Sequence, residues 1–217
     1  MQTLTQRIID QGLANRLLSD TQLARLLDGS AQRRHNLVNR AMKAGELVRL
    51  RRGAYVLDDR FRTYPAHPFA LAQAFVAGSY VSFETALAYH GWIPEAVYTT
   101  ACVTPGRKTL TRDHPLFGSF SFHPLAIAPG HFLVQVERLQ AVQQTMLVAK
   151  PFRALMDLVC LRKVEWQGMG WLVDGLRIDH EHLRNVADTD IRMLGAVYSQ
   201  KRVKSFLHAF ARELGND

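Results

Sequence analysis

A basic helix that runs directly into a basic hairpin is the feature that most limits how this chain can fold. The stretch from Ser30 to Leu57 holds seven cationic side chains and a single acid, Glu46, so its formal charge is +6 of the +8 carried by all 217 residues. Ser30 suits a helix N-cap, because its hydroxyl can accept a hydrogen bond from a first-turn amide. Gly45 indicates the end of the helix. The pattern after it predicts two short strands, residues 47–50 and 54–56, joined by a turn.

The predicted helix has one apolar face and one polar face. Leu37, Val38, Ala41 and Met42 recur at three- and four-residue spacing, which predicts a buried stripe. The opposite face is rich in Gln, Asn and Arg, whose donors and acceptors match base edges in the major groove of DNA. We predict that Arg33, Asn36, Asn39 and Arg40 read or flank bases, and that Lys43, Arg49, Arg51 and Arg52 hold phosphates. The whole predicted DNA-binding set is Ser30, Gln32, Arg33, Arg34, His35, Asn36, Asn39, Arg40, Lys43, Arg49, Arg51 and Arg52.

Two further helices are expected before this stretch. Residues 20–27 predict a short helix that is capped by Ser19 or by the next residue and followed by a turn at Asp28 and Gly29. A first helix over residues 5–17 would complete a three-helix core. Helices and hairpin in this order predict a winged helix-turn-helix domain that binds double-stranded DNA. The alternative is a solvated basic helix followed by an unrelated hairpin.

The length of the chain favours two domains, residues 1–60 and residues 61–217, because a winged helix needs only the first sixty residues or so. The boundary is expected within residues 58–68, where the hydrophobic alternation ends and two prolines occur. The N-terminus has no basic start followed by an apolar run, and the most apolar window, residues 69–81, is too short to span a bilayer. We therefore expect a cytoplasmic protein that does not span a membrane.

The second domain is predicted to be mixed α/β with a helical C-terminus, so that the chain as a whole is α+β. Its two cysteines, Cys102 and Cys160, lie among apolar residues and are expected to be buried hydrophobes rather than a disulfide or metal ligands. The predicted helices are residues 69–77, 82–90, 151–161, 170–184 and 188–214, the last capped by Asp188 and broken at 199–201, and the predicted strands are 80–81, 99–103, 118–122, 132–137 and 145–148.

Three segments of the chain resemble the AbiEi-type antitoxins and related winged-helix transcriptional regulators of phage-defence loci. They are the predicted wing, Gly45 to Leu57; a Ser-x-x-x-Ala-Leu-x-x-His-Gly segment made by Ser82, Ala86, Leu87, His90 and Gly91; and a segment made by Ala149, Pro151, Ala154, Leu155, Asp157 and Leu158. The resemblance implies repression of the protein's own operon by the N-terminal domain. It also implies neutralisation of a nucleotidyltransferase-like toxin by a route that involves the C-terminal domain, as in a type IV toxin–antitoxin system.

No catalytic site, metal site or cofactor is predicted. His180 and His182 flank Glu181 in a helical stretch, where an i, i+2 pair points to different faces, so a solvated polar face is favoured over metal ligation. His90 and Asp157 could be polar partners, but a helix-terminal His and an exposed helical Asp are favoured. Two other functions stay open: a ligand-sensing repressor, and an enzyme acting on nucleic acid, for instance through distant acids such as Glu137 and Asp157. The oligomeric state is not predicted.

The last helical segment carries a second cluster of cations, Lys201, Arg202 and Lys204. The simpler interpretation is a terminal helical pair that closes the core of the second domain and exposes a solvated basic face. The functional interpretation is a second electropositive surface that contacts flanking DNA or an acidic surface of the toxin.

Overall fold

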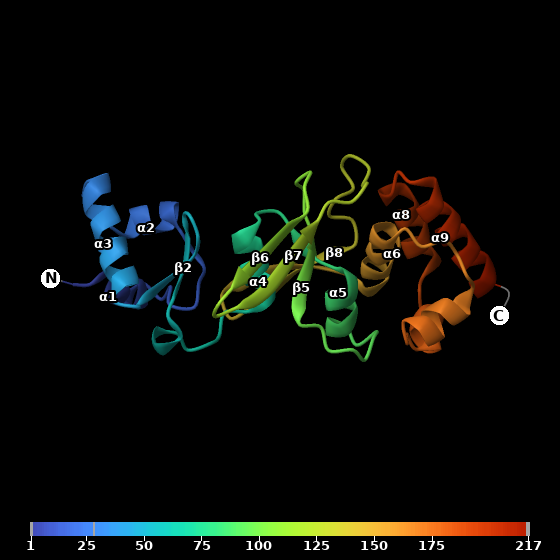
Figure 1. Cartoon of the computed structure of the whole chain (residues 1–217), viewed down its shortest axis with the longest axis horizontal. Coiled ribbons are helices and arrows are strands. Elements are labelled where there is room, and N and C mark those ends of the chain that lie inside the picture. The colour runs from blue at the N-terminus through green and yellow to red at the C-terminus, as the bar shows by residue number, and fades with distance from the viewer. Residues whose placement is uncertain (1, 28, 216–217) are drawn as a thin grey trace. The chain divides into compact units, whose positions relative to one another are not determined.

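The computed structural model describes residues 2–27 and 29–215 and shows a mixed α+β chain with helices and two sheets (Figure 1). Contacts divide the chain into two compact units. The first is Met1–Ala77 together with Leu139–Met146, and the second is Gly78–Arg138 together with Leu147–Asp217. The first unit thus includes residues beyond the predicted domain of residues 1–60, and the domain boundary itself stays a prediction.

The first unit packs helices against a three-stranded antiparallel sheet with strand order β1-β3-β2. Its core contains Leu4, Ile8, Leu23, Val38 and Leu57, all buried. Because these residues come from α1, α2, α3 and β3, one apolar cluster holds the N-terminal elements together. The elements are α1 (Leu4–Asp10), β1 (Leu18–Ser19), α2 (Asp20–Leu26), α3 (Ala31–Lys43), β2 (Leu47–Arg51), β3 (Ala54–Leu57), a 3₁₀ turn at Asp59–Phe61 and α4 (Pro68–Phe75).

The predicted basic helix and hairpin are confirmed. Ser30 caps α3 by accepting a hydrogen bond from the amide of Arg33 at 3.2 Å. The helix ends before Gly45, whose φ of +67° is a backbone conformation that glycine adopts without strain. In the hairpin turn, Gly53 has a φ of +78°, and a Cβ there would lie 2.9 Å from a carboxylate oxygen of Asp20. A glycine is therefore required at the turn for two separate reasons.

Of the first two helices, α1 is shorter than predicted and α2 agrees with the prediction. The expected helix over residues 5–17 is wrong in length, because α1 ends at Asp10. Gly12 follows with a φ of +66°, and the amide of Leu13 bonds back to the carbonyl of Ile8, a glycine-terminated helix end. The helix over residues 20–27 is confirmed as α2, with Ser19 as its cap. A turn was predicted after α2, and its residue Asp28 lies outside the described residues.

The second unit contains most of a mixed sheet whose strand order is β6-β7-β5-β4-β9-β8, and only the parts of β8 and β9 within Leu139–Met146 are assigned to the first unit. β4 pairs with β9 and β5 with β7 in parallel, whereas β4 with β5 and β6 with β7 are antiparallel. The elements are β4 (Tyr80–Val81), α5 (Phe83–Tyr89), β5 (Thr99–Val103), β6 (Leu110–His114), β7 (Gly118–His123), β8 (Val136–Ala141), β9 (Gln144–Ala149), α6 (Pro151–Arg162), a π-helical turn at Trp171–Gly175, α7 (His180–Arg184), α8 (Asp188–Val197) and α9 (Lys201–Leu214).

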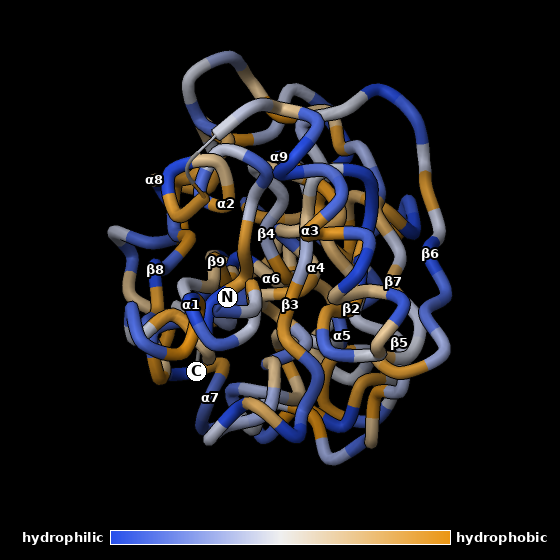
Figure 2. Tube along the Cα trace, turned by 90° about the vertical axis from the view of Figure 1, so that its left-hand side faces the viewer, coloured by the Kyte–Doolittle hydropathy of each residue, from blue (hydrophilic) through white to orange (hydrophobic). Residues whose placement is uncertain are grey.

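Helix α6 is the centre of the second unit's core. Nine consecutive residues from Phe152 to Cys160 are buried, and α5, α8 and α9 all contact the helix. By contrast, β6 and α7 are coloured mainly as polar in Figure 2. Cys102 and Cys160 are buried and free, as predicted, and burial raises the pKa of both thiols.

Several predictions for residues after the first sixty are confirmed and others are wrong. Strands β4, β5, β7 and β9, helix α4 of the first unit, helices α5 and α6, and the break between α8 and α9 are confirmed. Asp188 is the first residue of α8 and its cap is Ala187. The strand predicted over residues 132–137 begins only at Val136, because Gln135 has a φ of +58°. The helix predicted over residues 170–184 is wrong, since it is interrupted between the π-helical turn and α7. Strand β6 was not predicted.

Candidate nucleic-acid interface

The twelve residues predicted to contact DNA come together on one part of the first unit. All lie in α3, at its N-cap, in β2 or in the turn that follows β2. Ten of them are exposed, and Arg34 and Asn39 are half-buried. The apolar stripe of α3 explains this placement, because burial of Val38 and Ala41 turns the opposite face of the helix to solvent.

A hollow of about 630 Å³ lies between α3 and the hairpin. We call it the α3–hairpin hollow. Two residues of α3, His35 and Asn39, line one side of it, and three arginines of the hairpin line the other. Its full lining is Asp20, His35, Val38, Asn39, Met42, Arg49, Leu50, Arg51, Arg52 and Tyr55.

Five cations of the predicted set are exposed and make no side-chain hydrogen bond or ion pair with any other described residue. Glu46 is the one acid of the basic stretch. Its carboxylate accepts a hydrogen bond from Thr5 of α1 at 2.6 Å rather than pairing with one of these cations. These cations are therefore available to a polyanion. We call them the free cations: Arg33, Arg40, Lys43, Arg49 and Arg52.

Two other arginines of the predicted set already have partners within the unit. Arg34 donates to the carbonyl of Gly29 at 2.6 Å, from the side of α3 that also carries Val38. Arg51 donates to the carbonyl of Ala74, next to the end of α4, and to that of Arg52. Both arginine side chains thus stabilise the unit through hydrogen bonds to backbone carbonyls, a role that the sequence did not indicate.

Side-chain amides on the polar face of α3 are paired one helical turn apart. Gln32 donates to Oδ1 of Asn36 at 3.1 Å, and Nδ2 of Asn39 contacts Nε2 of His35 at 2.8 Å. Each pair joins residues four apart, which lie one above the other on a helix. The amides therefore have defined orientations rather than free rotation.

Asp20 and Tyr55 also line the α3–hairpin hollow, and the sequence analysis did not single them out. The amide of Asp20 donates to the carbonyl of Gly53 at 3.2 Å, which fixes α2 to the hairpin turn. Burial, and then the charge and hydrogen bonding of the Asp20 carboxylate, raise the pKa of Tyr55. No local sequence signal could have found these contacts, because the two residues lie 35 positions apart.

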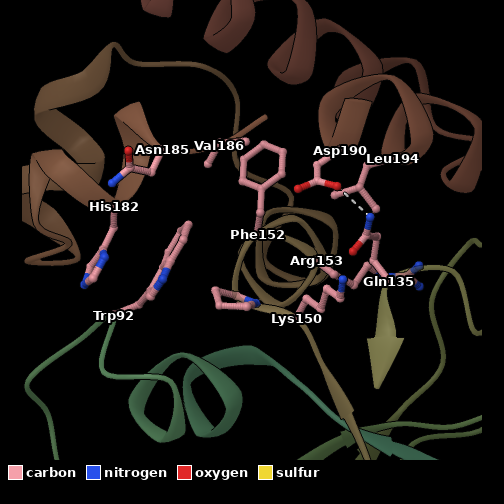
Figure 3. Close-up of a pocket in the computed structure, with 11 residues that line it drawn as sticks. Trp92, Gln135, Lys150, Phe152, Arg153, His182, Asn185, Val186, Asp190 and Leu194 are labelled. Carbon is pink, nitrogen blue, oxygen red and sulfur yellow. Dashed lines mark hydrogen bonds between the residues drawn. The ribbon is translucent and has the colours of Figure 1, made fainter. Parts of the chain in front are cut away.

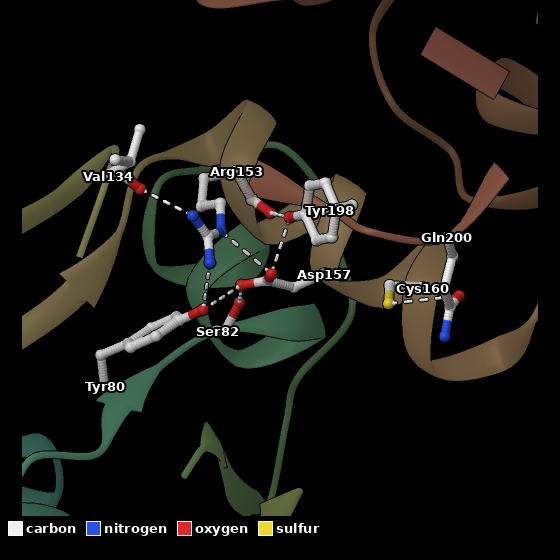
Figure 4. A network of polar contacts seen from close by, with 8 residues as sticks. All are labelled: Tyr80, Ser82, Val134, Arg153, Asp157, Cys160, Tyr198 and Gln200. Atoms are coloured by element: carbon white, nitrogen blue, oxygen red, sulfur yellow. Dashed lines mark hydrogen bonds and ion pairs between the residues drawn. The ribbon is translucent and has the colours of Figure 1, made fainter. Parts of the chain in front are cut away.

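Asp157 of the second unit is buried, which corrects the prediction of an exposed helical acid. Its carboxylate accepts hydrogen bonds from Tyr80 at 3.0 Å, Ser82 at 2.7 Å and Tyr198 at 2.7 Å, and pairs with Arg153 at 3.0 Å (Figure 4). Burial and this carboxylate raise the pKa of both tyrosines well above the usual value.

The buried network has two consequences for the sequence predictions. His90 contacts the carbonyl of Ala149 at 2.9 Å rather than Asp157, so the suggested polar partnership is wrong. Arg153 also donates to the carbonyl of Val134 and to Tyr80, so all three guanidinium nitrogens and both oxygens of Asp157 have hydrogen-bond partners. An acid enclosed in this way cannot approach a substrate, and it leaves Glu137 without its suggested partner in a nuclease site.

A cavity of about 180 Å³ lies in the second unit beside the first turn of α6 (Figure 3). Trp92 and Phe152 give it aromatic walls, and the imidazole of His182 stacks on Trp92 with ring centroids 5.5 Å apart. Gln135 donates to Asp190 at 2.7 Å on the opposite side. The cavity thus combines aromatic surface with a few polar groups, a composition that suits a small ligand.

The second basic surface lies on α9. Lys201 and Lys204 are exposed, whereas Arg202 is half-buried and donates to Gln200 at 2.9 Å. The opposite side of α9 buries Val203 and Phe206 in the core, so the helix closes this unit. Whether the cations also contact a partner stays a prediction.

Comparisons with known proteins give no family. No family model matches the chain, and no curated protein matches it. Among the described residues, no cluster of His, Cys, Asp or Glu could hold a metal ion. No helix in the described ranges is long and apolar enough to cross a membrane.

Proposed function

We propose that this protein is a transcriptional repressor whose N-terminal winged helix-turn-helix binds double-stranded DNA upstream of its own gene. The observation that carries the proposal is the set of five free cations around a helix face that bears oriented amides. Lysine and arginine on phosphates supply affinity and register, and amide side chains can recognise base edges. In this arrangement α3 enters the major groove, and the hairpin is the wing that lies on the phosphate backbone.

The distribution of charge supports the same assignment. Residues 1–77 hold twelve Lys and Arg against six Asp and Glu, whereas residues 78–217 hold fifteen against thirteen. The excess that would attract a polyanion is therefore concentrated in the first unit. The second unit is nearly neutral, so we assign it a role other than DNA binding.

For the second unit we propose the role that the resemblance to AbiEi-type antitoxins implies, neutralisation of a nucleotidyltransferase-like toxin without catalysis. Its support is the resemblance of the segments around Ser82 and Asp157 to that family. The test is co-expression with the product of the adjacent gene. Rescue of growth by the full chain supports the antitoxin role, and absence of rescue contradicts it.

Ligand-sensing repression is a second candidate, favoured by the cavity beside α6. A panel of small aromatic acids and amines, screened for an increase in melting temperature, tests it. A compound that stabilises the parent protein but not a Trp92→Ala variant, and that releases the protein from DNA, would favour the sensor.

Protection of DNA from cleavage tests the central proposal. The full chain should protect a site in the duplex upstream of its own gene, and an Arg49→Glu, Arg52→Glu double variant should not. Both side chains are exposed and free of partners among the described residues, so reversing their charge should leave the fold intact. Equal protection by the two proteins, or none by the parent, would contradict the proposal.

A further inference from the structure

The cavity beside the first turn of α6 joins apolar walls to a polar end. Figure 3 shows Gln135 and Asp190 across the cavity from Trp92. The buried apolar side chains that line it are Trp92, Phe152, Val186 and Leu194. A small molecule in the cavity would therefore place an apolar group against aromatic surface and a polar group beside Asp190.

Two side chains of opposite charge line the cavity, and neither has an ion-pair partner within the described part of the chain. Asp190 accepts a hydrogen bond from Gln135 on Oδ1 and keeps Oδ2 available. Lys150 makes no side-chain hydrogen bond to another described residue. Arg153 also lines the cavity, but all three of its guanidinium nitrogens are bonded in the buried network. The lysine and the aspartate are therefore the charged groups still available to a ligand.

Gln135 connects these two charged residues. Its carbonyl accepts from the amide of Lys150 at 2.9 Å, and its side chain donates to Asp190 at 2.7 Å. Its φ of +58° is a backbone conformation that residues other than glycine rarely adopt, so the surrounding structure must hold it there. The carboxylate and the start of the lysine side chain are thus held in defined places by one residue.

The size of the cavity limits what can enter it. Its volume of about 180 Å³ lies below the roughly 300–1,000 Å³ of sites for drug-sized ligands, so nucleotides and other large cofactors do not fit. We propose that the cavity binds a free α-amino acid with an apolar side chain. The ammonium group of the ligand bonds to Asp190 and its carboxylate to Lys150, and its side chain packs on Trp92 and Phe152.

A ligand that carries both charges satisfies both side chains, whereas a simpler one does not. An organic acid would leave Asp190 without a partner, and an amine would leave Lys150 without one. The N-terminus of α6 adds to the attraction for a carboxylate, because the first-turn amides of Phe152 and Arg153 have no hydrogen-bond partner among the described residues. The assignment deepens the ligand-sensing function, the second candidate on which it rests, by naming the ligand.

Calorimetric titration of the full chain with L-leucine and with L-phenylalanine tests the assignment. At least one of the two should bind. Analogues that lack one charged group should bind roughly tenfold or more weakly, because each loses a charge-assisted hydrogen bond. The analogues without the ammonium group are isocaproate and phenylpropionate, and those without the carboxylate are isoamylamine and phenylethylamine. Equal affinity for an amino acid and its two analogues would contradict the pairing of both charges.

Two variants separate contact with the ligand from a structural role. Asp190→Asn keeps an acceptor for Gln135 but removes the charge, so it should weaken the amino acid roughly tenfold or more and should not weaken the analogue without ammonium. Lys150→Gln should likewise weaken the amino acid but not the analogue without a carboxylate. A structural role would weaken amino acid and analogue alike. The matched controls, Asp188→Asn and Lys108→Gln, change exposed residues that do not line the cavity and should bind as the parent does.

The outcomes distinguish the ligand from the functions proposed for the chain. If neither amino acid binds, or if Asp188→Asn weakens binding as much as Asp190→Asn, the assignment is wrong, and DNA binding measured without ligand still stands. If an amino acid binds as expected but leaves the affinity for the upstream duplex unchanged, the ligand is right and the sensing function falls. If the parent binds no duplex, the repressor falls, and calorimetry alone still decides what the cavity binds.

Discussion

Arg52 and Arg34 differ in one respect that can be measured, namely whether the guanidinium already has a partner. Arg52 is exposed and free among the described residues, whereas Arg34 donates to the carbonyl of Gly29. Arg52→Ala should weaken binding about equally on the protein's own site and on random duplex, and should reduce the salt slope by roughly 0.9, the value of one phosphate contact.

Arg34→Ala is the matched control for this prediction. It should leave the salt slope unchanged, since its guanidinium serves the turn before α3. Fluorescence titrations at several salt concentrations make the comparison. A slope that falls as much for Arg34→Ala as for Arg52→Ala would show that the two arginines are equivalent toward DNA.

The buried acid gives a second prediction at the scale of one residue. Asp157→Asn preserves shape but leaves the Arg153 guanidinium enclosed without its counter-charge, so it should destabilise the protein by about 3 to 5 kcal/mol. Ser82→Ala removes only one of the donors and should cost about 1 to 3 kcal/mol. Denaturant unfolding measures both free energies, and a loss below about 1 kcal/mol for Asp157→Asn would show that the pair is not needed.

At the scale of elements, α4 contains a pH-sensitive cap. Nδ1 of His67 accepts a hydrogen bond from the amide of Phe69 at 3.2 Å, which requires a neutral ring, and burial lowers the pKa of His67. The folded protein therefore disfavours the imidazolium. The stabilisation is complete above the unfolded value of about 6.5 and is lost as the pH falls from there toward the lower folded value.

The loss should be about 1 kcal/mol, the usual contribution of an N-cap. His67→Asn keeps an acceptor at the cap without a titrating ring, so its unfolding free energy should fall less between about pH 7.5 and pH 5.5. The difference between the two proteins isolates His67 from His123, whose pKa is also lowered by burial. Identical pH profiles for parent and variant would contradict a titrating cap.

The elements also show which parts of the fold a sequence can predict. Helix α3 and its hairpin follow from signals within the segment: a Ser cap, an apolar stripe, and glycines where the backbone takes a positive φ. Strand β6 follows from its neighbour instead, because Leu110 is its only apolar residue and its pairing with β7 defines it. The irregular turn at Gln135 likewise takes a conformation that local preference does not favour.

The same division applies to the candidate site. The exposed cations could be predicted because helical spacing fixes the buried stripe, and the remaining face must be solvated. The hydrogen bond between Arg51 and α4 could not be predicted. Neither could the hydrogen bonds that Asp157 accepts from residues 41 and 75 positions away. These contacts depend on how distant segments pack, about which local patterns carry no information.

At the scale of the whole molecule, the second basic surface tests whether the second unit also contacts a partner. Lys201→Glu with Lys204→Glu should leave the melting temperature nearly unchanged, since both side chains are exposed. Arg202 is left intact because it is half-buried and bonded to Gln200. If α9 contacts a partner, the double variant should weaken either promoter repression or rescue from the neighbouring toxin. Full retention of both activities would reduce this surface to a solvated face.

The central claim is that the first unit binds duplex DNA through its free cations, and the salt dependence of affinity tests it most directly. Five phosphate contacts should give a slope of log K against log salt near −4.5, at roughly −0.9 for each contact. The titration uses the full chain and the duplex upstream of its own gene. A slope near −4.5 that falls toward −2.7 in the Arg49→Ala, Arg52→Ala variant is the predicted result. Binding that does not change with salt would contradict the account.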